Sequence, residues 1–307
     1  MIVHLPETTA NDVGKRLVKL RDEGGAVTLG RVLTLIIRVG EDDLEEAVEA
    51  ANDASREHPC RVIVISPVGR ANATARLDAE IRVGGDAGAS EVILLRPAGP
   101  IVDHVDTLVT PLLLPDVPIV VWWPTDAPED PSADPLGAIA HRRVTDSTKE
   151  TSGEAMLRRL AAEHEPGDTD LAWARVTLWR GLIAAALDQP PYESVSSVTI
   201  EGESGHTSID LLAAWLRLRL RCPVTVRRHR DADAITRVTL ERKSGSIVFD
   251  RPDGRVVTIS QPDQPDRHVA LPIRLLNEAL AEELRRLDPD EMFGEVLTKG
   301  LAKLDAA

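Results

Sequence analysis

The chain has 307 residues, of which 43% are hydrophobic and 3% aromatic, and its formal net charge at pH 7 is −14. A chain of this length is long for a single hydrophobic core, so two domains are expected. The acidic balance argues against nucleic-acid binding, which needs a basic surface, and no segment is long and apolar enough to span a membrane. Cys60 and Cys222 match no disulfide framework or zinc site, and the N-terminus lacks the features of a signal peptide. We therefore expect a cytoplasmic protein that holds neither a metal nor a cofactor.

The first half of the chain alternates helix and strand patterns. A helix is predicted over residues 11–23, with Gly24-Gly25 as its stop, and a buried strand follows within residues 26–39. The next predicted elements are a helix over 42–58, a strand over 61–65, a hairpin of strands 79–83 and 91–96 that turns at 84–88, a helix over 104–114, and strands over 117–123 and 141–145. This order predicts an α/β domain over residues 1–165 with a mixed, mostly parallel sheet, Rossmann-like but without a phosphate loop.

The second half has a different pattern and begins where Pro166-Gly167 interrupts the chain. Before this break, Thr151 and Glu154 predict a capping box at the start of a helix that runs to about residue 163. The elements expected afterwards are a helix over 171–187 capped by Asp168 or Asp170, a strand over 195–200, a helix over 207–220, strands over 224–228, 235–240, 246–249 and 256–260, and a last helix from 272 to about 287. We expect an α+β domain over residues 166–307 with an antiparallel meander.

The predicted strand 117–123 ends in two adjacent tryptophans, Trp122 and Trp123, and Pro124 then stops it. Residues 124–136 follow as an acidic, proline-rich loop that contains Asp126. Ligands and partners often bind at the strand ends of α/β proteins, and Trp is enriched in binding hot spots. Because successive side chains alternate between faces, we expect one indole in the core and the other in contact with a partner. The parity of the neighbouring apolar residues favours Trp123 for the core and Trp122 for the contact.

The predicted helix 171–187 carries a second concentration of tryptophan and arginine: Trp173, Arg175, Trp179 and Arg180. Two interpretations stay open for it. The four residues could contribute to partner binding, or the helix could be a core element in which Arg175 stacks on Trp179.

Motifs for catalysis are missing from the sequence, and no catalytic residue is assigned. There is no G-x-G-x-x-G, no G-x-x-x-x-G-K-[ST] and no G-x-S-x-G. The candidate anion-binding residues are Arg142 and Arg143 with Asp146 and Ser147, since paired arginines beside a helix start suit a phosphate. The alternative is a salt-bridged strand end. The arginines between residues 217 and 230 predict either a solvated surface or contact with an acidic protein.

Three stretches resemble motifs of the glucose-6-phosphate dehydrogenase assembly protein family, OpcA, in its actinobacterial form: residues 119–124 (Ile-Val-Val-Trp-Trp-Pro), residues 170–180 (Asp-Leu-Ala-Trp-Ala-Arg-Val-Thr-Leu-Trp-Arg) and residues 58–63 (His-Pro-Cys-Arg-Val-Ile). The resemblance runs over essentially the whole chain. It implies a non-enzymatic protein that binds glucose-6-phosphate dehydrogenase and favours its active oligomer, supporting the oxidative pentose phosphate pathway and NADPH supply. The alternative is a sugar-phosphate- or nucleotide-binding α/β enzyme that uses Arg142, Arg143 and Asp146.

Overall fold

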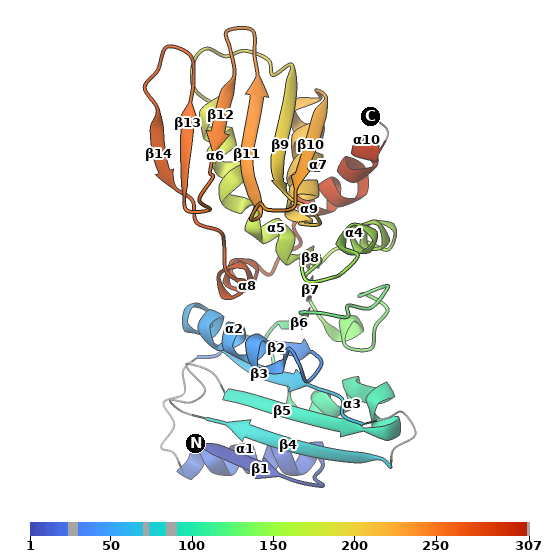
Figure 1. The fold of residues 1–307 in the computed structure, drawn as a ribbon. Coiled ribbons are helices and arrows are strands. Elements are labelled where there is room, and N and C mark those ends of the chain that lie inside the picture. Colours follow the sequence, from blue (N-terminus) through green and yellow to red (C-terminus); the bar gives the residue numbers. More distant parts are fainter. Residues whose placement is uncertain (24–29, 70–73, 84–90, 306–307) are drawn as a thin grey trace. The chain divides into compact units, whose positions relative to one another are not determined.

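The computed structural model describes residues 1–23, 30–69, 74–83 and 91–305 (Figure 1). They form two compact units, and each unit is discontinuous in sequence: unit 1 contains Met1–Asp146 and Leu276–Pro289, and unit 2 contains Ser147–Leu275 and Asp290–Ala307. The sequence predicted two continuous domains that meet at residue 165. The difference has a packing cause, because helix α8 (Leu276–Leu284) packs on helix α2 (Leu44–Glu57) and so returns the chain to unit 1.

Unit 1 contains a mixed, mostly parallel sheet, as the sequence predicted. Its strands are β1 (Ile2–Leu5), β2 (Leu33–Arg38), β3 (Cys60–Ile65), β4 (Arg76–Arg82), β5 (Glu91–Ala98), β6 (Ile119–Trp123) and β7 (Arg142–Thr145). Within unit 1 they lie in the order β1-β4-β5-β3-β2-β6-β7. The strands from β5 to β7 in this order are parallel, whereas β4 pairs antiparallel with both β5 and β1. The hairpin pairing of β4 with β5 is confirmed, but its predicted turn and the predicted stop at Gly24-Gly25 lie outside the described residues.

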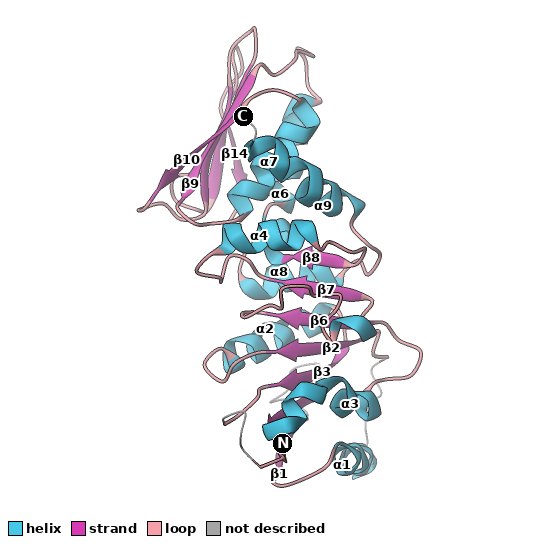
Figure 2. Cartoon of the chain, turned by 90° about the vertical axis from the view of Figure 1, so that its right-hand side faces the viewer, coloured by secondary structure: helices cyan, strands magenta, loops and turns pink. Residues whose placement is uncertain are grey.

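Helices cover both faces of this sheet. Figure 2 shows α2 on one side and α1 (Ala10–Glu23) with α3 (Val105–Val109) on the other. An apolar cluster joins α1 and α3 to the side chains of one sheet face. The predicted helix 104–114 is broken into η2 (Gly99–His104), α3 and η3 (Thr110–Leu112), and a further 3₁₀ turn, η4 (Gly137–Ile139), precedes β7. Pro111, in the first turn of η3, accounts for the end of α3, because proline cannot donate the backbone hydrogen bond that would continue that helix.

Unit 2 contains a six-stranded sheet in the order β10-β9-β11-β12-β13-β14. Its strands are β9 (Ser197–Glu203), β10 (Val224–His229), β11 (Ile235–Glu241), β12 (Ile247–Asp250), β13 (Val256–Ser260) and β14 (Arg267–Ala270). The predicted antiparallel meander is right for β11 to β13, and β14, which was not predicted, extends it. It is wrong for β10, which runs parallel to β9 because helix α7 (Ser208–Leu220) returns the chain to the same end of the sheet.

Helices of unit 2 lie on one side of that sheet (Figure 2). Besides α7, unit 2 contains α4 (Gly153–Ala162), the short strand β8 (Asp168–Asp170), α5 (Leu171–Arg175), α6 (Thr177–Leu187), α9 (Glu291–Glu295), the π-helix η5 (Val296–Gly300) and α10 (Leu301–Asp305). The predicted helix 171–187 is divided at Val176, and the Thr151 capping box is not formed, since Ser152 precedes α4 without a side-chain cap. Asp170 caps α5 by accepting the N–H of Ala172.

Both cysteines are buried, Cys60 in unit 1 and Cys222 in unit 2. Burial raises the pKa of the Cys222 thiol, which keeps it in the unreactive neutral form at pH 7. Among the described residues no helix has the length and apolar character needed to cross a membrane, and no group of His, Cys, Asp and Glu is arranged to hold a metal ion.

Candidate partner-binding surface

The two tryptophans at the end of β6 are both core residues. Trp122 is 0% exposed and Trp123 is 1% exposed. They lie on opposite faces as predicted: Trp123 and Val121 belong to the apolar cluster under α1 and α3, and Trp122 takes the other face. The expected exposure of Trp122 is wrong, because β6 pairs with both β2 and β7 in a sheet that is covered on both faces. An indole with no exposed area cannot contact a partner in this conformation.

The acidic loop, residues 124–136, is held in one shape by its own aspartates. Asp130 Oδ1 accepts hydrogen bonds from the Ser132 N–H at 2.9 Å, the Ser132 hydroxyl at 2.7 Å and the Ala133 N–H at 3.1 Å. Asp134 Oδ1 accepts the Leu136 N–H at 2.9 Å. Leu136 is fully buried in the same cluster as Trp123. The end of the loop is therefore anchored in the core beside the strand from which the loop starts.

Two carboxylates of the acidic loop face solvent, Asp126 and Glu129, whereas Pro124 is buried. Asp126 has a backbone φ of 52°, which places it in the left-handed region of a tight turn. The hydrogen bond from the Ser132 hydroxyl is the largest cause that lowers the pKa of Asp130, so that carboxylate keeps its charge and its turn at neutral pH. The loop thus presents negative charge on a preorganised backbone, which reduces the ordering entropy that binding would otherwise cost.

The predicted anion-binding residues are buried within the protein. Arg142 is 2% exposed and donates to Glu283 Oε2 at 2.6 Å and to the Asp288 carbonyl at 2.7 Å. Arg143 and Asp146 are also buried. Ser147 lies in unit 2, where its hydroxyl and N–H both donate to the Asp170 carboxylate. For Arg142 the structure matches the alternative interpretation of a salt-bridged strand end, because its charge is already offset by Glu283.

The tryptophans of α5 and α6 are also internal. Trp173 is 1% exposed and its Nε1 donates to Asp290 Oδ2 at 2.8 Å, and Trp179 is 2% exposed. The stacking of Arg175 on Trp179 stays a prediction. The Arg180 guanidinium lies 3.6 Å from the Trp173 ring centroid, and that of Arg251 lies 5.0 Å from the Trp179 ring centroid. These cation–π contacts support the interpretation of a core element.

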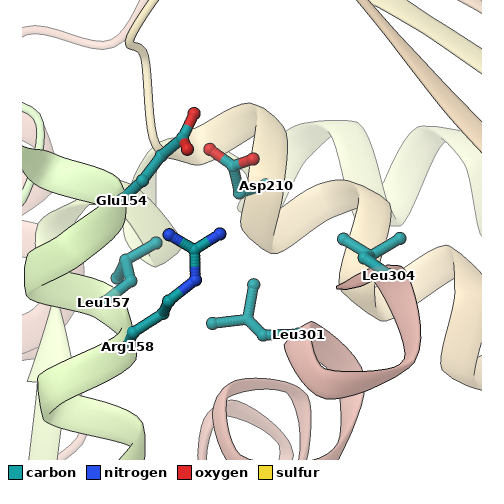
Figure 3. A pocket seen from close by; sticks show the side chains of 6 residues that line it. All are labelled: Glu154, Leu157, Arg158, Asp210, Leu301 and Leu304. Atoms are coloured by element: carbon teal, nitrogen blue, oxygen red, sulfur yellow. The ribbon is translucent and has the colours of Figure 1, made fainter. Parts of the chain in front are cut away.

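A cluster of charges that was not predicted from the sequence lies beside α7. Arg228 Nη2 lies 2.5 Å from Asp210 Oδ1 and 2.9 Å from Glu154 Oε1. Figure 3 shows a neighbouring hollow in which the Arg158 guanidinium points toward both carboxylates. Its apolar side is formed by Leu157, Leu301 and Leu304. No local sequence signal links α4, α7 and β10, since only the tertiary fold brings these helices and this strand together.

Burial dominates the chemistry of Asp210. It raises the pKa of this carboxyl to about 6, and the charge of Arg228 only partly opposes the effect. The charge of Glu154 raises the pKa further. Among the ion pairs of the described residues, Arg228 is the one arginine between residues 217 and 230 that contacts two carboxylates. Its charge is therefore used inside unit 2.

Comparisons with known proteins point to one family over most of the chain. Residues 51–162 match the family described as glucose-6-phosphate dehydrogenase subunit N-terminal domain, and residues 166–297 match the corresponding C-terminal domain. A "Putative OxPP cycle protein OpcA" of Synechococcus elongatus is 27% identical over 282 residues, which is 86% of this chain. One of Nostoc punctiforme, with the same name, is 27% identical over 61% of this chain. The chain spans 60% of the length of the first relative and 44% of the second.

A solved oxidoreductase from Sinorhizobium meliloti is similar in fold, with a TM-score of 0.51 and 11% identity over 89% of this chain and 96% of that one. At this identity the similarity describes the fold alone. It confirms a Rossmann-like N-terminal sheet followed by a second domain. The actinobacterial form of the family stays a prediction.

Truncation of either β6 tryptophan should reduce stability. We expect Trp122→Ala and Trp123→Ala each to lower the free energy of unfolding by about 3–5 kcal/mol, because each leaves a large cavity in a sheet covered on both faces. Urea denaturation followed by circular dichroism measures the loss. Tyr192→Ala is the control, since Tyr192 is 80% exposed and its truncation should change stability by less than about 0.5 kcal/mol. A Trp122→Ala protein with wild-type stability would show that this indole is exposed in solution.

The Asp210 carboxyl should titrate near pH 6 in the folded protein, against an ordinary pKa of 3.8. Between these values the folded protein keeps a proton that the unfolded chain has released, so this group's contribution to stability falls as the pH rises from about 4 to 6, by on the order of 2 kcal/mol. Carboxyl-carbon NMR measures the midpoint, and Asp210→Asn should remove that part of the pH dependence of unfolding.

The matched control for this titration is Asp253→Asn. Backbone hydrogen bonds from Arg255 and Val256 lower the pKa of Asp253, so its titration lies below the window in question. The variant should leave the pH dependence between 4 and 6 unchanged. A midpoint for Asp210 below about pH 4.5 would contradict the assignment.

Proposed function

The chain belongs to the glucose-6-phosphate dehydrogenase assembly family, OpcA, and we propose that it is a non-enzymatic partner that binds glucose-6-phosphate dehydrogenase and favours its active oligomer. The observation that carries this proposal is the pair of family matches, which follow one another over residues 51–162 and 166–297. The names of the two relatives connect them to the OxPP cycle. We place the protein in the cytoplasm, where it would support the oxidative pentose phosphate pathway and the supply of NADPH.

The physical basis of such activation is a difference in binding affinity. A partner that binds the active oligomer more tightly than the inactive form shifts the population by that difference, and a partner that binds both equally shifts nothing. A mostly inactive enzyme becomes mostly active when the difference reaches on the order of 3–5 kcal/mol. A few desolvated hot-spot contacts supply an energy of this size.

We propose the acidic loop as part of the docking surface. Its fixed backbone and the exposed carboxylates of Asp126 and Glu129 favour a basic surface on the dehydrogenase. Trp122 and Trp123 would contribute indirectly, by anchoring the strand from which the loop leaves. Trp173, Arg175, Trp179 and Arg180 are proposed to act in the same indirect way through unit 2, since both indoles are buried.

The alternative of a sugar-phosphate- or nucleotide-binding enzyme at Arg142, Arg143 and Asp146 has less support. The guanidinium of Arg142 is occupied by Glu283 and by the Asp288 carbonyl, and all three residues are buried. A substrate would have to displace an internal ion pair, which costs several kcal/mol.

The proposal is tested by mixing the purified chain with the dehydrogenase of the same organism. We expect the dehydrogenase to shift to a larger species in size-exclusion chromatography with light scattering, and its turnover of glucose 6-phosphate and NADP to rise. The chain alone should show no turnover. An unchanged oligomer with unchanged activity, or turnover by the chain freed of all dehydrogenase, would overturn the proposal.

Charge removal in the acidic loop should weaken docking without affecting the fold. We expect Asp126→Asn with Glu129→Gln to lower the association rate with the dehydrogenase about three- to tenfold at low salt, because rim charges act mainly on encounter. Asn tolerates the positive φ of residue 126. Surface plasmon resonance over a range of salt concentrations measures the change, which should diminish as salt rises.

The matched control is Asp263→Asn with Asp266→Asn in unit 2. These two aspartates are exposed, have the same spacing and remove the same charge, and Asp263 has a φ of 57° against 52° for Asp126. The control pair should bind like the wild type. Equal losses for the two pairs would indicate a general charge effect and would remove the acidic loop from the docking surface.

A further inference from the structure

Unit 2 contains a second hollow, at the ends of α5 and β12, that the proposed function does not use. It has about 270 Å³ of unoccupied space, part of it open to solvent. Its lining consists of Arg175, Val176, Trp179, His206, Ser208, Ala234, Ile235, Arg251, Ile273 and Arg274. Three of these side chains are guanidinium groups, one is an imidazole, and none of the described lining residues is acidic. In a chain with a net charge of −14, such a concentration of cations needs an explanation.

Arg251 is the deepest of the three arginines, at 3% exposed. Its Nε and Nη2 donate to the Ile235 carbonyl at 3.1 and 2.6 Å, and its Nη1 donates to the Leu271 carbonyl at 3.0 Å. Its guanidinium lies 5.0 Å from the Trp179 ring centroid. These contacts fix the side chain with neutral groups, and among the described residues no ion pair to Arg251 is recorded.

The charge of Arg251 is therefore held in place but poorly compensated. Loss of hydration is the largest effect on the pKa of this guanidinium and lowers it to about 10, while the exposed Asp253 only partly restores it. At neutral pH the group is still protonated. A buried cation without a carboxylate is costly unless a counter-charge reaches it.

Two further features direct positive potential into the same hollow. Arg274 lies at its edge, half-buried, with Nη1 fixed on the Ala174 carbonyl at 3.0 Å, and Arg175 lines the wall formed by the end of α5. Ser208, which also lines it, is the first residue of the thirteen-residue helix α7. The N-terminal turn of a helix of this length carries a positive partial charge and N–H donors.

We propose that this hollow binds the phosphate group of a small ligand through Arg251, Arg274 and Arg175. Guanidinium groups match the tetrahedral oxygens of phosphate with paired, charge-assisted hydrogen bonds. The enclosed part of the hollow has room for little more than one phosphate-sized group, and the rest is open to solvent, so the occupant is inorganic phosphate or the phosphate end of a small metabolite. The Trp179 ring packs against the Arg251 guanidinium and helps to fix its position for the ligand. The site does not require the dehydrogenase, so it stands independently of the proposed function.

Calorimetric titration of the full chain tests this proposal. The probes are inorganic phosphate and glucose 6-phosphate at constant ionic strength, with glucose and potassium chloride as controls. We expect saturable binding of at least one phosphate probe with a dissociation constant at or below about 1 mM, and none of glucose. Equal affinity for the two probes would identify free phosphate as the ligand, and tighter binding of the sugar phosphate would identify a phosphorylated metabolite.

Variants locate the binding. Arg251→Gln and Arg274→Gln should each weaken the bound probe at least about tenfold, as expected for the loss of a charge-assisted hydrogen bond. Arg237→Gln is the matched control, since it removes the same charge from β11 outside the hollow, where Arg237 pairs with Asp250. Because Arg251 is buried, circular dichroism is used to check that the Arg251→Gln variant folds. If it does not fold, the double variant Arg274→Gln with Arg175→Gln tests whether the hollow binds the probe.

Two outcomes measured on the chain alone would overturn the proposal. One is the absence of saturable binding of either phosphate probe to the wild-type chain at about 10 mM. The other is binding that survives both Arg251→Gln and Arg274→Gln, or that the Arg237→Gln control weakens equally. If only the complex with a protein partner responds to Arg251→Gln, the hollow receives an acidic side chain of that partner and the small-ligand site is excluded.

Discussion

The coverage of the unit 1 sheet on both faces determines how the rest of that unit is arranged. β6 lies between β2 and β7, and helices cover both sides of the sheet, so each side chain of β6 after its first residue is buried. Two indoles can occupy adjacent positions only because the two faces are both apolar. β6 ends at Trp123, and the buried Pro124 that follows cannot donate the backbone hydrogen bond that would continue the strand. The acidic loop begins at a rigid point and returns to the same core through Leu136.

Buried arginines in the two units differ in how their charge is offset. In unit 1, Arg142 pairs with Glu283 at 2.6 Å, and Arg61 pairs with Glu91 at 3.0 Å. Each pair exchanges hydration for a Coulombic contact, and loss of one partner would leave an uncompensated charge. Arg251 in unit 2 is as deeply buried but is held by carbonyl oxygens and an aromatic ring. These partners set its position without neutralising it, which is the arrangement expected of a group that receives an external anion.

Most of the elements could be predicted from sequence because their patterns are local. The alternation of buried strands with helices identified the α/β sheet, and Asp170, one of the two predicted helix caps, does cap α5. What failed depends on distant partners. The exposure of Trp122 depends on what covers β6, the direction of β10 depends on the path of α7, and the role of Arg142 depends on Glu283, which lies 141 residues away. The hollow around Arg251 draws its lining from α5, α6, α7, β11 and the segments that follow β12, so no spacing rule could have found it.

The motifs by which the chain resembles its family are mostly internal. Trp122 and Trp123 fill the sheet core, and Trp173 is fixed by Asp290 and by the guanidinium of Arg180. Residues of this kind preserve the geometry of a fold, and they report on family membership because the same core must be packed each time. A binding surface has a different requirement, since its side chains have to reach the partner. Under the proposed function, recognition of the dehydrogenase would therefore depend on exposed residues that carry no motif, and the buried tryptophans would hold those residues in place.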